Sequence, residues 1–147
     1  MTQKINLVTL GVDDLDEAIL FYEDALGFTS MAQEGSVAIF NLSNSWLALL
    51  PKGALVEDNN WLAAEDDSLV PSLNFLVHHV TNKSEVDEVI MQAVEAGSKL
   101  FKAPTNLPSG GYEGYFTDLD GHLWQVVWNP NYYISNDYMA ARYSLPN

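Results

Sequence analysis

No cysteine occurs among the 147 residues of the chain. This absence excludes disulfide bonds, a thiolate nucleophile and a cysteine-ligated zinc site. The sequence also lacks long hydrophobic runs, and none approaches the ~18–20 consecutive apolar residues of a membrane-spanning helix. Its first ten residues, MTQKINLVTL, lack a basic segment followed by an apolar signal core. We therefore expect a protein that is not exported and has a cytoplasmic location.

Basic residues are scarce as well. Six lysines and arginines stand against 20 aspartates and glutamates, which gives a formal net charge of −14. A surface of that charge repels phosphate groups, so we expect no nucleic-acid partner and no membrane partner. Apolar residues, in contrast, are abundant: 48% of the chain is hydrophobic and 12% is aromatic. That is enough to build the core of one globular domain.

The first fifty residues predict one β-α-β-β-β unit. Residues 4–12 are rich in Ile, Val, Leu and Thr, which favour a buried strand. Residues 15–26 carry apolar side chains at helical spacing. Asp13 or Asp14 can cap this helix, and Gly27 can end it. Three further strands are expected at 29–35, 36–43 and 45–52.

The same order of elements returns after a polar, acidic segment. A strand is expected at 72–80 and an amphipathic helix at 84–97, where a glycine ends it. A short strand around 99–103 then precedes a hairpin, 112–118 and 122–128, across an Asp-Leu-Asp-Gly turn. The repeated order, rather than sequence identity between the halves, indicates two βαβββ modules.

These elements predict a single α+β domain over residues 1–147. Its parts are module one (4–52), a linker (53–71), module two (72–130) and a C-terminal tail (131–147). The tail is rich in tyrosine and fits neither module, so we expect it to pack on its own domain or on a partner subunit.

Three segments carry a family likeness: GVDDLDEAILFYEDALGF, EVDEVIMQAVEAG and GGYEGYFTDLDGHLWQVVWNP. Together they are similar to the vicinal oxygen chelate superfamily, which includes glyoxalase I, fosfomycin- and bleomycin-resistance proteins and extradiol dioxygenases. The resemblance covers nearly all of residues 4–130 and is greatest to a glyoxalase-like branch with an acidic residue in the last strand, where this chain has Gln125. It implies that the two modules curl into a half-barrel, a curved mixed β-sheet, around a cavity within one chain or across a dimer.

Metal-dependent members of that superfamily take four ligands from the first and last strands of the two modules, commonly histidine and glutamate. The resemblance carries these positions onto Leu7, Ala48, Phe75 and Gln125. Three of these residues cannot bind a cation through their side chains, and the fourth offers only a neutral amide oxygen. Shifting the strand register by one or two residues restores no histidine or glutamate. We therefore expect no metal site, no cofactor and no standard catalytic residue.

What remains is an apolar, aromatic pocket that could bind a small molecule. Gln125 is a polar residue within an otherwise apolar strand, and it either orients a ligand or is satisfied by neighbouring backbone or buried water. Trp46 or Trp61 could close the mouth of the pocket. The candidate ligand-binding residues are Thr9, Trp46, Ala48, Phe75, Tyr112, Phe116 and Gln125.

Other polar residues have structural interpretations. Asp118, Asp120 and His122 belong to the turn of the hairpin, where carboxylates commonly accept hydrogen bonds from loop amides. Glu113 alternates with Tyr112 and Phe116, so it points out of the pocket if those two rings point in.

The first functional hypothesis is a homodimeric, small-molecule-binding protein without metal, in the manner of the bleomycin-resistance branch. The alternative is a metal-dependent lyase, isomerase or dioxygenase with non-standard ligands such as His78 or His79. These two adjacent strand residues point to opposite faces and cannot chelate one ion together. A metal-free proton-transfer enzyme and a docking role for the tail are further possibilities.

Overall fold

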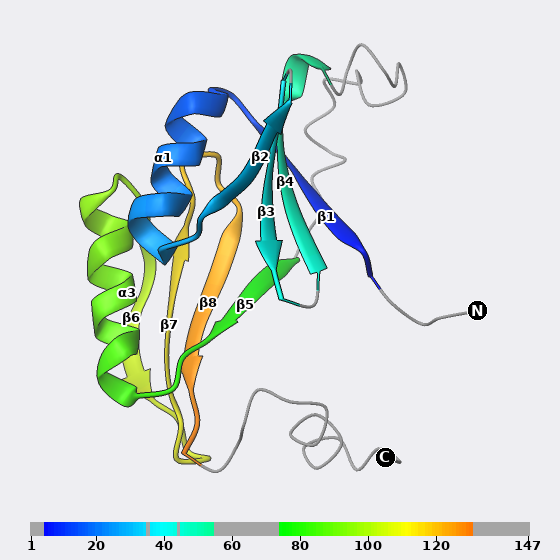
Figure 1. The fold of residues 1–147 in the computed structure, drawn as a ribbon. Helices are drawn as coiled ribbons and strands as arrows, with labels where there is room; N and C mark the ends of the chain where they lie inside the picture. Colours follow the sequence, from blue (N-terminus) through cyan, green and yellow to red (C-terminus); the bar gives the residue numbers. More distant parts are fainter. Residues whose placement is uncertain (1–4, 35, 44, 55–73, 131–147) are drawn as a thin grey trace.

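The chain folds into two βαβββ modules in the computed structural model. The structure describes residues 5–34, 36–43, 45–54 and 74–130. The elements of module one are β1 (Leu7–Val12), α1 (Leu15–Leu26), β2 (Ser30–Glu34), β3 (Val37–Leu42) and β4 (Ser45–Pro51). Its four strands form sheet one in the order β1-β4-β3-β2 (Figure 1). Strand β1 runs parallel to β4, and the other neighbours are antiparallel.

Module two repeats this topology. Its elements are β5 (Phe75–His79), α3 (Lys83–Glu95), β6 (Lys99–Asn106), β7 (Tyr112–Thr117) and β8 (Leu123–Trp128). Sheet two has the equivalent order β5-β8-β7-β6, again with one parallel pair, β5 and β8. The predicted α+β fold with two βαβββ modules is therefore confirmed. The strands that the structure describes form two open sheets and no closed barrel.

The ends of the helices follow from local sequence. Asp14 precedes α1, and its side chain accepts a hydrogen bond from the backbone nitrogen of Glu17 at 3.0 Å. Gly27 ends α1 in the left-handed conformation, with φ of 67°, which costs glycine little. At the start of α3, the Asn82 side chain instead donates to Glu85 Oε1 at 2.7 Å. No helix in the described ranges is long and apolar enough to cross a membrane.

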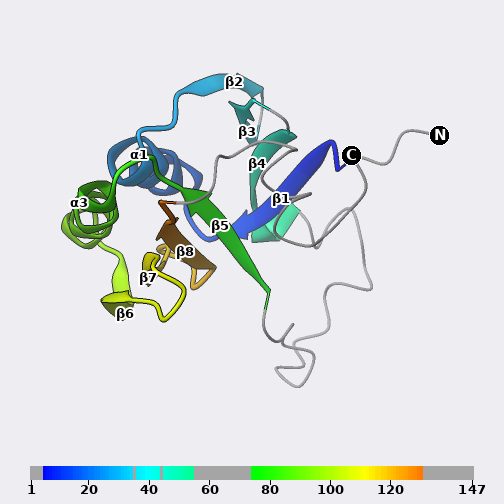
Figure 2. The ribbon, with the colours of Figure 1, turned by 90° about the horizontal axis from the view of Figure 1, so that it is seen from below.

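One hydrophobic core joins the two modules. Helices α1 and α3 lie side by side and cover the same side of the molecule in both views (Figures 1 and 2). The ring of Tyr22, on α1, lies 6.1 Å from that of Phe40 in module one and 5.8 Å from that of Trp124 in module two. Phe116 stacks on Trp124 beneath the helices, with ring centres 6.3 Å apart. Burying each such ring contributes about 1.5–3 kcal/mol.

Gly114 lets α3 approach sheet two closely. A Cβ atom at this position would lie 3.2 Å from Cγ1 of Ile90, on α3, and 3.2 Å from Cγ of Pro104. Both distances are tighter than ordinary van der Waals contact, so a side chain here would push the helix away from the sheet.

Candidate functional site

Each sheet has a face turned away from the two helices, which we call its open face. Val8 and Leu10 of β1 and Leu76 of β5 pack against the core, so the residues that alternate with them lie on the opposite side. Those open-face residues include four large apolar side chains that are 44–46% exposed: Leu7, Trp46, Phe75 and Val77.

Strand pairing places equivalent positions of the two modules in matching rows across the open faces. In sheet one, Ala48 lies between Thr9 and Ile39. In sheet two, Gln125 lies between Val77 and Tyr115, and Tyr115 in turn lies opposite Lys102. Ala48 and Gln125 are therefore equivalent, as the sequence comparison of the last strands predicts. The side chains of the row in sheet one are small or apolar, whereas the row in sheet two ends in the polar side chains of Tyr115 and Lys102.

The polar groups of sheet two converge on Glu113. Gln125 Nε2 donates to Glu113 Oε2 in a close hydrogen bond. The hydroxyl of Tyr115 lies 3.4 Å from the same oxygen, and Lys102 Nζ lies 3.4 Å from Oε1. The Glu113 side chain is only 9% exposed, although it lies on the open face. Gln125 thus sits beside a buried carboxylate supplied by the neighbouring strand.

Two aromatic rings pack against Tyr115, whose hydroxyl contacts this carboxylate. The Tyr115 ring lies 5.9 Å from that of Phe75 and 6.4 Å from that of Phe101, both in edge-on arrangements. Lys102 Nζ lies 5.8 Å from the centre of the Tyr115 ring. Burial, together with the negative charge of Glu113, raises the pKa of the Tyr115 hydroxyl above its ordinary value. The hydroxyl is therefore a neutral hydrogen-bond donor at physiological pH.

The structure brings five of the seven predicted ligand-binding residues to the open faces: Thr9, Trp46, Ala48, Phe75 and Gln125. It places Phe116 and Tyr112 on the other side of sheet two. Phe116 is fully buried in the core, and the Tyr112 hydroxyl donates to Asp87 Oδ1, on α3, at 2.7 Å.

The alternation along β7 was predicted correctly, but the face assigned to it was wrong. Antiparallel pairing sets Tyr115 directly opposite Gln125, so Tyr115 and Glu113 share the face of Gln125. Phe116 is opposite Trp124 and shares its core face. Glu113, expected to point out of the pocket, is therefore the carboxylate nearest Gln125. Trp61 lies outside the described residues.

The four positions onto which the resemblance carries the metal ligands do not fit a cation in this chain. The side chains of Leu7, Ala48 and Phe75 offer no ligand atom, and Gln125 offers only a neutral amide oxygen while its nitrogen donates to Glu113. Within the part of the chain that the structure describes, no three His, Asp or Glu side chains gather in a way that could hold an ion. Among those residues, Glu113 belongs to no group of three such side chains.

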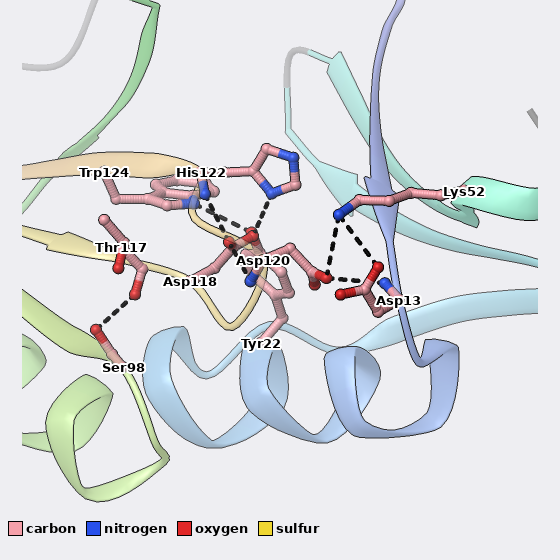
Figure 3. A network of polar contacts seen from close by, with 9 residues as sticks. All are labelled: Asp13, Tyr22, Lys52, Ser98, Thr117, Asp118, Asp120, His122 and Trp124. Atoms are coloured by element: carbon pink, nitrogen blue, oxygen red, sulfur yellow. Dashed lines mark hydrogen bonds and ion pairs between the residues drawn. The ribbon is translucent and has the colours of Figure 1, made fainter. Parts of the chain in front are cut away.

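The hairpin turn of module two is built around Asp118 (Figure 3). Its Oδ1 accepts from the backbone nitrogens of Asp120 and His122, at 2.9 and 2.8 Å. Its Oδ2 accepts from the Tyr22 hydroxyl at 2.6 Å and lies 2.7 Å from His122 Nδ1. Trp124 Nε1 in turn donates to the Tyr22 hydroxyl at 3.1 Å. A carboxylate only accepts hydrogen bonds, so His122 carries its proton on Nδ1.

This network holds the turn of module two against helix α1 of module one. Burial raises the pKa of Asp118, but the hydrogen bonds from His122 and Tyr22 outweigh burial and hold that pKa below its ordinary value. Burial next to Asp118 raises the pKa of Tyr22 far above its usual range. Both groups keep fixed protonation states near neutral pH. The structural interpretation of Asp118 and His122 agrees with these contacts.

A second contact of the same turn reaches module one. Asp120 Oδ1 accepts from the backbone nitrogen of Asp13 at 2.8 Å, and Lys52 Nζ lies 3.1 Å from Asp13 Oδ1 (Figure 3). On the other side of the turn, Ser98 Oγ donates to the Thr117 carbonyl at 2.6 Å. Asp118 and Asp120 therefore each bind a residue of module one, Tyr22 and Asp13 respectively.

His78 and His79 alternate along β5, as expected. The His78 ring lies 6.1 Å from that of Phe28, at the junction of the modules. Burial, and secondarily the proximity of His79, lowers the pKa of His78 below its ordinary value. His78 is therefore a neutral ring packed between the modules.

A model of the family described as "Glyoxalase/Bleomycin resistance protein/Dioxygenase superfamily" matches residues 4–126. The metallothiol transferase FosB of Lysinibacillus sphaericus is 25% identical over 126 residues, which cover 84% of this chain and 80% of that protein. The glutathione transferase FosA of Serratia marcescens is 27% identical over 124 residues, covering 83% and 78%. The crystal structure of a glyoxalase-related enzyme from Fulvimarina pelagi superposes with a TM-score of 0.79 and 28% identity, covering 93% of this chain and 96% of that one.

Proposed function

The chain belongs to the glyoxalase/bleomycin resistance protein/dioxygenase superfamily, and from this premise we propose that it binds a small organic molecule on the open face around Gln125 without a resident metal ion. The observation that carries the proposal is the hydrogen bond from the Gln125 amide nitrogen to Glu113, at a position where the resemblance implies a carboxylate. An amide held in this way can orient a ligand but cannot anchor a divalent ion by itself.

The surroundings of Gln125 suit a ligand with apolar parts. Phe75 and Val77 flank it on β5 and are nearly half exposed, so apolar surface is available beside a fixed polar group. Concave sites that combine apolar walls with a few oriented polar atoms are typical of small-molecule binding. Similar proteins named as a metallothiol transferase and a glutathione transferase are 25–27% identical, and the proposal does not include their transfer reactions.

A calorimetric titration of EDTA-treated protein with Ni²⁺, Zn²⁺, Mn²⁺ and Fe²⁺ tests the metal-free part of the proposal. We expect no tight, stoichiometric site. A stoichiometric site that disappears in Glu113→Gln would overturn the proposal and favour the alternative, a metal-dependent lyase, isomerase or dioxygenase in which Glu113 replaces the missing ligand. The same titration of Glu88→Gln, an exposed residue of α3, controls for the change in net charge.

A thermal-shift screen of small organic molecules tests the binding itself. A compound present at 100 times its Kd stabilises the folded protein by about 2.7 kcal/mol, which corresponds to a rise in Tm of roughly 5–10 °C. The shift should be lost in Gln125→Ala and kept in Gln92→Ala, which removes an exposed amide from α3. Equal shifts in both variants would place the binding elsewhere.

The homodimer expected from the sequence is part of the same proposal. Leu7, Trp46, Phe75 and Val77 are each nearly half exposed in a single chain, which is unfavourable for large apolar groups gathered on open sheet faces. Light scattering should give twice the mass of one chain. A monomer at micromolar concentration would contradict the expectation.

A further inference from the structure

We propose that the open face of sheet two selects ligands that carry an ammonium group, with Glu113 as its counter-ion and the Tyr115 ring as its second contact. This inference rests on the proposed function and adds the chemical class of the ligand.

Glu113 is a preformed anchor for a cation. Its side chain is 9% exposed and is held by Gln125 and Tyr115, so the carboxylate has lost most of its hydration before any ligand arrives. A dehydrated carboxylate gains most from a partner that carries a full positive charge.

The orientation of Gln125 adds a second acceptor. A carboxylate cannot donate, so the Gln125 amide must turn its NH₂ group toward Glu113, and its oxygen lies at the other end of the same amide. Glu113 and Gln125 together therefore present acceptors to an incoming group, which suits an N–H-bearing cation better than an anion.

Lys102 shows that an ammonium group fits between the carboxylate and the ring. Its Nζ lies 3.4 Å from Glu113 Oε1 and 5.8 Å from the centre of the Tyr115 ring. A cation within about 6 Å of an aromatic face is attracted by the ring quadrupole. The lysine side chain is 49% exposed and its contact with Glu113 is long, so a ligand ammonium can displace it at little cost.

The surroundings favour a cation with an apolar body. Phe75 and Phe101 stand edge-on to Tyr115 and are both well exposed, which provides ring surface beside the carboxylate. The net charge of −14 attracts cations to the chain as a whole and repels anions.

The test compares four probes that share a phenyl ring: benzylamine and benzyltrimethylammonium as cations with and without N–H groups, benzyl alcohol as the neutral analogue and benzoate as the anion. Binding to the full chain is followed by calorimetry and by NMR shifts. We expect the cations to bind best and to weaken as salt is raised. Glu113→Gln should weaken cation binding by about ten- to hundredfold, whereas Glu88→Gln, with the same change of charge, should leave it unchanged.

Lys102→Met provides a second variant, at an exposed position that folding tolerates. Since it removes the competing internal cation, it should tighten cation binding by several-fold. The opposite result, in which benzoate binds best and Lys102→Met abolishes its binding, would overturn the inference and make Lys102 an anion anchor.

Failure of this inference can be distinguished from failure of the proposed function. If benzyl alcohol binds as well as the cations and depends on Gln125, the ammonium preference is refuted and small-molecule binding stands. If no probe shifts the signals of the open face and the protein instead takes up a stoichiometric metal ion, both proposals are refuted.

Discussion

Replacing Tyr22 with phenylalanine removes a single oxygen atom from the point where the two modules meet. That oxygen donates to Asp118 Oδ2 at 2.6 Å and accepts from Trp124 Nε1 at 3.1 Å. Tyr22 comes from α1 in module one, whereas both partners belong to module two. The tyrosine side chain is fully buried, so no water can replace the missing hydroxyl without rearrangement.

The size of the loss follows from these two contacts. A hydrogen bond to a charged group contributes about 1.5–3 kcal/mol, and a buried donor left without an acceptor costs about 1–3 kcal/mol. The two effects belong to one network and overlap, so we expect Tyr22→Phe to lower the free energy of unfolding by about 3 kcal/mol. For a chain of this length the melting temperature should fall by roughly 10 °C.

Tyr112→Phe is the matched control, because its hydroxyl also donates to an aspartate, Asp87, at 2.7 Å, but at the surface. Water can replace that bond, so the loss should be about 0.5 kcal/mol or less. Urea unfolding of both variants and the parent measures the difference. Equal losses in the two variants, or a loss below about 0.5 kcal/mol for Tyr22→Phe, would refute the idea that this buried hydroxyl joins the modules.

Two further predictions concern the same core. Gly114→Ala should destabilise the protein by about 1–3 kcal/mol because its Cβ would press on Ile90 and Pro104, whereas Gly53→Ala, with no atom within 4 Å of the added Cβ, should be neutral in the same urea titration. The lowered pKa of Asp118 means that the unfolded chain binds a proton at a higher pH than the folded one. The stability due to Asp118 should therefore be complete well above its ordinary pKa of 3.8 and fall as the pH drops below it. The urea midpoint of the parent should therefore fall as the pH drops below 3.8, and Asp118→Asn should not show this fall. The same fall in the variant would contradict the assignment.

Much of the fold could be predicted from local sequence signals. Helix α1 begins after Asp14 and ends at Gly27 because capping and the left-handed conformation are properties of a few adjacent residues. Both modules could also be identified, because each strand and helix carries its own local pattern of apolar residues and the order of these elements repeats. Strand ends were less accurate: β5 begins at Phe75 rather than at residue 72, and β6 extends to Asn106.

The composition of the site could not be predicted in the same way. Alternation along β7 separates Glu113 from Phe116 but does not say which of them faces Gln125. That choice depends on the register between β7 and β8, where Tyr115 is opposite Gln125. The hairpin could have supplied this register, since counting outward from the Asp118–Gly121 turn pairs Thr117 with Leu123 and hence Tyr115 with Gln125.

The resemblance implies a carboxylate on the last strand, and in this chain a carboxylate lies on the neighbouring strand instead. Position 125 is a neutral amide, but Glu113 supplies a carboxylate from the adjacent strand and binds that amide directly. The equivalent face of sheet one has Thr9, Ala48 and Ile39 in the matching row, and none of these three side chains is anionic. Glu113 keeps one carboxylate on the open face of sheet two. In the inference above, that charge favours an organic cation, which needs one counter-ion and an apolar wall rather than four converging ligands.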